Sequence, residues 1–165
     1  MKVPVCEICA YTNNLCKPCK DRYAAGEITD ADIHLSRILY SMAKHKEMGE
    51  ISIARTITVN KLLLILVEDN PGILIGKAGK NIKRISQELG YSVRVINSRK
   101  APREMIADLL WPIPVLGVNE VFSGGEEYVK IRLPHTYARR LPFDNDTLTK
   151  GAGRLFSKNA KIVFE

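Results

Sequence analysis

The chain has 165 residues, which is enough for one good core or for two small domains that share an interface. An apolar fraction of 45% excludes a disordered chain, and the longest apolar run, 62–67, is too short to span a membrane. The first residues contain no extended apolar stretch, so we expect no signal peptide and a soluble, cytoplasmic protein with no membrane partner. The net charge of +7 favours a polyanionic partner.

The N-terminal segment, residues 1–27, is rich in cysteine. Two Cys-x-x-Cys pairs, Cys6 with Cys9 and Cys16 with Cys19, are separated by six residues. Each pair can place two thiolates on one ion, and two pairs complete a tetrahedral zinc site with no open position. We therefore predict a structural Zn²⁺ that organises a segment too short for a core of its own.

Other readings of the cysteines fit less well. An iron–sulfur centre is the alternative metal site, but the usual ferredoxin spacing does not match. A redox disulfide would use one pair and leave the other idle. The bound segment could touch RNA or a protein, or brace the helix that follows it.

Residues 28–100 show alternating helix and strand patterns. A helix is expected at 29–48, where Thr29 and Asp32 form a box-like cap and Gly49 ends the helix. The elements after it are a half-buried strand at 51–59, a turn at 60–61, an apolar strand at 62–67 that is central or covered on both sides, a helix from Pro71 to Gly76, a helix at 80–89 and a strand at 91–97. This order predicts an α+β fold in which a three-stranded sheet carries helices on one face.

Residues 101–165 repeat part of that order. The sequence predicts a helix at 102–110, a hairpin of 115–122 and 128–133 around Gly124 and Gly125, a helix at 144–156 and a strand at 161–164. The segment could be a degenerate second copy that lacks one helix and a well-formed glycine turn. Glycines do recur at 150–153, but with a different spacing.

The turn between the helices of the first unit reads Gly76-Lys77-Ala78-Gly79. Glycine has no Cβ, so a nucleic-acid backbone can approach closely, and the following helix directs its N-terminal amides at a bound phosphate. Basic residues continue beyond the turn. Residues 1–69 hold nine Lys/Arg and nine Asp/Glu, whereas 70–165 hold sixteen and nine, so the whole positive excess lies from the turn onward.

With this turn in this order of elements, residues 29–97 resemble the KH family, whose hallmark is a Gly-x-x-Gly loop. The helix before the strands and the final strand resemble the type II arrangement. The resemblance implies a groove for about four unpaired nucleotides of single-stranded RNA. The residues expected to contact RNA are Gly76, Lys77, Ala78, Gly79, Lys80, Lys83, Arg84 and Arg94. Ile73, Ile75 and Ile82 line the groove or lie in the core, and Arg99 is a further contact or an ordinary exposed arginine.

Enzymatic readings are not supported. Residues 72–76 are one residue too short for a phosphate-binding P-loop, and Ala78 stands where its metal-binding hydroxyl belongs. No zinc-hydrolase or deaminase motif accompanies the cysteines, and the three histidines are scattered. We therefore expect a non-enzymatic protein.

The combination of a zinc knuckle pair, a type II KH unit and a possible second unit resembles archaeal NusA-like KH proteins. That resemblance implies a role in transcription elongation or termination, with RNA polymerase or ribosome components as possible partners. A ribosome-assembly or RNA-processing factor remains the alternative. A third possibility is a scaffold in which the KH fold binds protein.

Overall fold

The computed structural model describes residues 1–165. The helices are α1 (Glu7–Tyr11), α2 (Lys17–Ala24), α3 (Asp30–Lys44), α4 (Pro71–Ile75), α5 (Lys80–Leu89), α6 (Pro102–Leu110) and α7 (Asn145–Phe156), with short 3₁₀ turns η1 (Lys77–Gly79) and η2 (His135–Tyr137). The strands are β1 (Ile53–Val59), β2 (Leu62–Val67), β3 (Ser92–Asn97), β4 (Gly117–Ser123), β5 (Glu126–Leu133) and β6 (Asn159–Phe164). No helix is both long and apolar enough to cross a bilayer.

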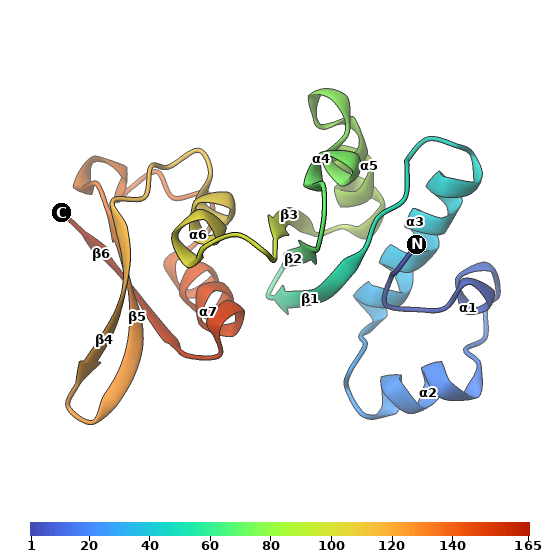
Figure 1. Ribbon diagram of the computed structural model, residues 1–165, viewed down its shortest axis with the longest axis horizontal. Helices are drawn as coiled ribbons and strands as arrows, with labels where there is room; N and C mark the ends of the chain where they lie inside the picture. The colour runs from blue at the N-terminus through green and yellow to red at the C-terminus, as the bar shows by residue number, and fades with distance from the viewer.

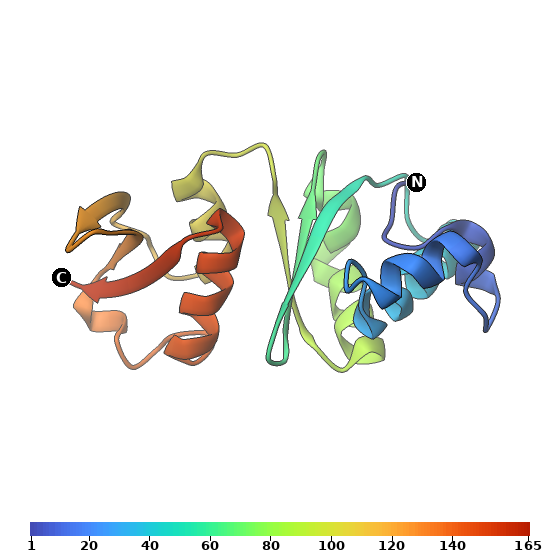
Figure 2. The same cartoon turned by 90° about the horizontal axis from the view of Figure 1, so that it is seen from below.

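The elements stack in layers along the long axis of the molecule (Figures 1 and 2). The small segment of α1 and α2 lies beside α3. Helices α3, α4 and α5 then cover one face of the sheet β1-β2-β3. Helices α6 and α7 fill the space between this sheet and the sheet β4-β5-β6.

The central strand β2 explains why residues 62–67 are uniformly apolar. All six are buried, as the run predicts for a strand covered on both sides. Leu63, Ile65 and Val67 pack into the core formed with α3 and α5. Leu62, Leu64 and Leu66 instead belong to an 18-residue core that also contains side chains of α6 and α7, so this second core is shared by residues on both sides of position 100.

The alternation expected for strand β1 is interrupted in the structure. The pattern placed every second residue from Ile51 to Val59 on one face. The structure has an irregularity of register between Ile53 and Arg55, where one extra residue is accommodated. Ile53 therefore packs with α3 and α5, while Ile57 packs with α6 and α7. A bulge shifts the strand by one residue and so exchanges the faces of all that follow.

Helix α3 begins as predicted and ends earlier. Thr29 and Asp32 form a complete capping box. The helix was expected to reach Gly49, but it ends at Lys44, because Lys46 adopts a left-handed φ of 56°. The Lys46 amide donates to the Ala43 carbonyl oxygen, and the Glu47 amide donates to the Met42 carbonyl oxygen. These two bonds are a Schellman motif in which lysine takes the usual glycine position.

The second sheet has the same pairing pattern as the first. In each sheet the central strand pairs antiparallel with the strand before it and parallel with the last strand. Residues 150–153 lie inside α7 and form no turn. Gly153 is required there by packing, since a Cβ would approach the Lys158 carbonyl oxygen to 2.7 Å.

Polar contacts reinforce the shared core. The Arg55 guanidinium donates to the Leu155 carbonyl at 2.7 Å, and the Asn60 side-chain amide donates to Thr147 Oγ1 at 2.8 Å. Both bonds join β1 or its turn to α7, so the two sheets and the helices between them form one packed body.

Candidate nucleic-acid interface and metal centre

The glycine turn forms a tight link between α4 and α5. Gly76 has φ 76° and ψ 171°, and Ala78 and Gly79 follow in the left-handed region at φ 53° and 74°. Three residues with positive φ within four positions reverse the chain between two helices. This conformation exposes the backbone at the start of α5, where helix amides and the helix dipole favour an anion.

A side chain that the sequence analysis did not single out holds this turn in place. Asn81 Nδ2 donates to the Ile73 carbonyl oxygen at 3.0 Å and so joins the first turn of α5 to α4. Asn81 also fills the space beside Gly76, where a Cβ would lie 2.7 Å from its Cγ. The only sequence signal for this role is an amide side chain two residues after the second glycine of the turn.

The lysines of the expected site are free to meet a ligand. Lys77, Lys80 and Lys83 are exposed. None of them takes part in an ion pair of the structure. Ala78 is also exposed, while Gly76 and Gly79 are half-buried. The turn therefore presents three unpaired cations beside its accessible backbone.

The two arginines of the expected site are engaged by other side chains. Arg84 is ion-paired with Glu47 and, at 2.9 Å, with Glu88. Arg94 points to the opposite face of the sheet, where it stacks over the ring of Phe143 at 5.4 Å and where burial lowers the pKa of its guanidinium. The strand alternation places Arg94 on this face, but the cover provided by Phe143 has no local signal. The structure thus separates Arg94 from the turn.

Apolar side chains border the turn. Leu74 and Ile85 are fully buried in the core of the first unit. Ile73, Ile75 and Ile82 are only partly buried against it. Tyr91, directly before the edge strand β3, and Val93 within that strand are likewise partly buried against the same cluster. These half-exposed side chains contribute to the core and also offer an apolar surface.

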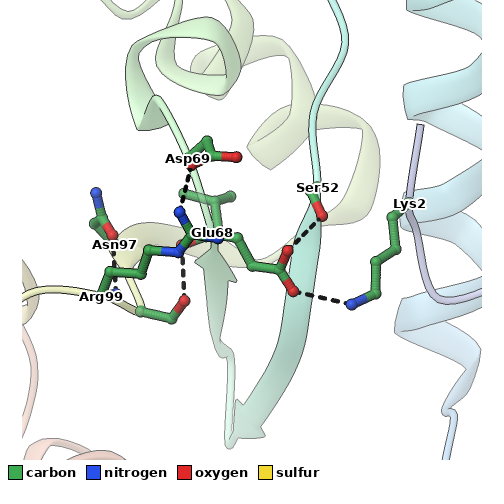
Figure 3. A network of polar contacts seen from close by, with 8 residues as sticks. Lys2, Ser52, Glu68, Asp69, Asn97 and Arg99 are labelled. Carbon is green, nitrogen blue, oxygen red and sulfur yellow. Dashed lines mark hydrogen bonds and ion pairs between the residues drawn. The ribbon is translucent and has the colours of Figure 1, made fainter.

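A polar network fixes the place where α4 begins (Figure 3). Glu68, which follows β2, accepts from Lys2 Nζ and from Ser52 Oγ, both at 2.9 Å. These contacts hold the pKa of Glu68 below its ordinary value, and the bond from Lys2 is the larger cause. Beside it, Arg99 pairs with Asp69 at 3.0 Å. The ends of the strands are thereby tied together directly before Pro71.

The four cysteines converge as their spacing predicts. Their sulfur atoms all lie within 4.8 Å of one another. Cys6 and Cys16 occupy the N-cap positions of α1 and α2, and Cys9 and Cys19 lie three residues later in the first turn of each helix. The two Cys-x-x-Cys pairs thus have the same local structure, and both helix N-termini face the cluster.

The cluster has dimensions that suit zinc. Four thiolates at about 2.3 Å from one Zn²⁺ form a tetrahedron whose sulfurs are about 3.8 Å apart. The Cys6 sulfur lies 3.9 Å from those of both Cys16 and Cys19. Burial raises the pKa of Cys9 to about 12, so four thiolates here need a compensating cation. Apart from two of these cysteines, the local core contains only Val5 and Ile28 as buried members.

The cysteine segment also contacts the first unit. The Val5 amide donates to Ser36 Oγ at 3.2 Å, and Arg37 donates to the Thr12 carbonyl at 3.0 Å. Lys2 forms an isolated bridge beside Ser52, next to β1. These contacts support the bracing role for the segment, with α3 as the element that it braces.

Comparison with known proteins places the chain in a family. The KH domain family matches residues 35–132, which is more than half of the chain. No curated protein sequence is recognisably similar. Among solved structures, that of APE1850 has a TM-score of 0.54 and 20% identity, and the match covers 77% of this chain and 96% of that chain. At this identity the likeness shows the fold alone.

KH domains are RNA-binding modules that use a Gly-x-x-Gly loop, and this chain carries the loop between α4 and α5 within the matched residues. The chain belongs to the KH domain family.

Proposed function

We propose that this protein is a non-enzymatic factor that grips single-stranded RNA through Gly76-Lys77-Ala78-Gly79. The observation that carries the proposal is the conformation of this turn. Its three positive φ angles expose the backbone at the start of α5, and three lysines without ion-pair partners surround it. A matched family whose members bind RNA through such a loop supports the same conclusion.

In this proposal the turn holds the RNA backbone and the neighbouring apolar surface holds the bases. Backbone amides of the turn and of the first turn of α5 donate to one phosphate, except those of Gly79 and Lys80, which bond to the Gly76 and Lys77 carbonyl oxygens. Lys77, Lys80 and Lys83 neutralise that phosphate and its neighbours. Bases can lie against Ile82 and Val93 only if they are unstacked and unpaired. The preference for single strands follows from that requirement.

We further propose that Cys6, Cys9, Cys16 and Cys19 hold one structural Zn²⁺. The support is the sulfur spacing together with the small local core. The ion supplies the stability that residues 1–27 lack and allows α1 to brace α3. We propose that residues 28–100 are the KH unit and that residues 101–165 are a degenerate KH-like unit, in line with their common strand pairing.

The biological setting that we propose is transcription elongation or termination, as in NusA-like proteins, with nascent RNA as ligand and RNA polymerase as partner. It is supported by the combination of the cysteine segment, the KH unit and the second sheet. Ribosome assembly or RNA processing would use the same grip on a precursor RNA. Sequencing the RNA crosslinked to the protein in cells distinguishes the two, since nascent messenger RNA supports the first and ribosomal precursors support the second.

The test of the grip is the double variant Lys77→Asp/Ala78→Asp. Both side chains are exposed, so the fold should persist. Affinity for a short single-stranded RNA should fall about a hundredfold, because charge-assisted bonds are lost and two carboxylates face the phosphates.

The matched control is Lys100→Asp/Ala101→Asp. It changes another exposed Lys-Ala pair by the same charge and lets Asp cap α6, although it also removes the Lys100–Asp108 ion pair. Its effect on affinity should be small. Equal losses in the two variants would mean that only the overall charge matters, and an unchanged affinity of the loop variant would refute the loop assignment.

A further inference from the structure

The sheet β4-β5-β6 has one face that no helix covers. Along β5, Val129, Ile131 and Leu133 are buried against α6 and α7, so Tyr128 and Lys130 point the other way. In both views α6 and α7 lie between the two sheets, which places this other face at the end of the stack (Figures 1 and 2). We call it the outer face, and its side chains are Asn119, Val121, Ser123, Glu126, Tyr128, Lys130, Arg132, Asn159, Lys161 and Val163.

The outer face differs from the corresponding face of the first sheet, which is apolar and covered by helices. There the central strand presents Leu62, Leu64 and Leu66 to α6 and α7 and is fully covered. The central strand of the second sheet presents Tyr128, Lys130 and Arg132 at the equivalent alternation. Two cations in the place of leucines would be costly under a further layer of helices. The outer face is built for a polar, charged occupant.

Two lysines on this face stand directly opposite each other. Lys130 on β5 pairs in register with Lys161 on β6. Like charges at directly opposed positions destabilise a sheet. Neither lysine forms an ion pair with any carboxylate. An anion placed between them would relieve the repulsion.

An aromatic ring and a guanidinium flank the lysine pair. Lys161 Nζ lies 4.3 Å from the centre of the half-buried Tyr128 ring. On the other side, Arg132 donates to Asn119 Oδ1 and pairs with Glu165, both at 3.2 Å. Arg132 lies across Gly117, where any Cβ would overlap its guanidinium. The ring, the lysine pair and the guanidinium thus form one row along β5, with Lys161 beside it on β6.

We propose that the outer face is a second contact surface for single-stranded RNA, separate from the glycine turn. Phosphates lie between Lys130 and Lys161, and a base stacks on Tyr128. Basic side chains combined with an accessible aromatic ring, here the half-buried Tyr128, are the elements that hold single strands with little sequence preference. This inference shares its ligand class with the proposed function but depends on different residues, so each can fail separately.

The test compares Lys130→Gln/Lys161→Gln with wild type on two RNAs. An oligonucleotide of about five nucleotides fills only the groove by the glycine turn, and its affinity should not change. One of about 25 nucleotides can reach both surfaces, and its affinity should fall about fivefold to tenfold. The slope of log K against log salt should decrease by about 1.4, which is 0.7 for each lost phosphate contact. Tyr128→Leu should likewise lower the affinity for the longer RNA and leave the affinity for the short RNA unchanged.

The matched control is Lys150→Gln/Lys158→Gln. It removes the same charge from lysines that already pair with Asp146 and Glu127. The Lys130/Lys161 variant should unfold at the same or a higher temperature than wild type, because a repulsion is removed. Equal affinities of that variant and wild type for the longer RNA, or equal losses in the control, would overturn the inference. If Lys77→Asp/Ala78→Asp leaves short-RNA binding intact while this variant weakens the longer RNA, the loop proposal fails and this one stands.

Discussion

The two glycines of the Gly-x-x-Gly turn should differ sharply in their tolerance of alanine. Gly76 has φ 76° and ψ 171°, a region open essentially to glycine alone. A Cβ there would lie 2.9 Å from the Asn81 backbone nitrogen, which cannot move without moving α5. Gly79 has φ 74° and ψ 17°, and a Cβ would meet only the Ile82 Cγ2 at 3.7 Å. Ala78 already adopts similar angles.

The cost of each substitution can be estimated from this geometry. For Gly76→Ala, the backbone region costs about 1–3 kcal/mol and the overlap a further 1–3 kcal/mol. Restriction of the unfolded chain returns about 0.4–1 kcal/mol, which leaves a loss of about 3 kcal/mol in the free energy of unfolding. For Gly79→Ala, a left-handed alanine costs about 1–2 kcal/mol with the same return, so the loss is about 1 kcal/mol.

Urea unfolding followed by circular dichroism measures both values, and binding to a short RNA is measured in parallel. Gly76→Ala should lower the midpoint strongly and abolish binding, whereas Gly79→Ala should remain folded. A Gly79→Ala variant that is as unstable as Gly76→Ala, or less stable, would refute the reasoning, because it would mean that neither the ψ angle nor Asn81 decides the difference.

Three further outcomes are expected. The purified protein should release about one zinc per chain to a chelator. The Cys9→Ser variant should lose both the metal and the ordered structure of α1 and α2. Stoichiometric iron with visible absorbance would contradict the zinc assignment. Because the pKa of Glu68 is lowered in the fold, its stabilising contribution is complete above the ordinary glutamate value of about 4.3 and is lost as the pH falls through the lower folded value. Glu68→Gln should therefore flatten the pH dependence of the melting temperature in that acid range, and an unchanged slope would exclude the Lys2 contact as a source of stability. Leu64→Ala should lower the free energy of unfolding by about 2–5 kcal/mol and lower the temperature of one common unfolding transition. Two separate transitions would show that the shared core does not couple the sheets.

The sequence was informative wherever local chemistry decides the structure. Thr29 and Asp32 announce the start of α3, and Gly90 ends α5 in the left-handed conformation that glycine favours. The unbroken apolar run of β2 indicates a strand covered on both faces, and the structure has it so. The cysteine spacing likewise predicts the sulfur cluster, because the six residues between the two Cys-x-x-Cys pairs are enough to bring the pairs together.

Features decided by distant contacts had no local signal. The end of α3 depends on Lys46 in a left-handed conformation for which lysine has no preference. The sequence therefore points to Gly49 as the end of the helix, although the helix ends at Lys44. The shift of register at β1 divides a regular alternation between two cores. Arg94 reads as an exposed cation until Phe143, almost fifty positions later, covers it. In each case tertiary packing overrides a local pattern.

The core shared across position 100 also limits how this protein can be divided. A fragment ending there would expose a sheet face that contains Ile57, Leu62, Leu64 and Leu66 to water, and the exposed apolar face would invite aggregation. Fragments prepared for RNA-binding work should therefore retain α6 and α7 even when only the glycine turn is of interest. In a cell, the ribosome must synthesise α7 before both faces of the sheet β1-β2-β3 are covered, so the sheet behind the proposed RNA-binding turn is complete only late in synthesis.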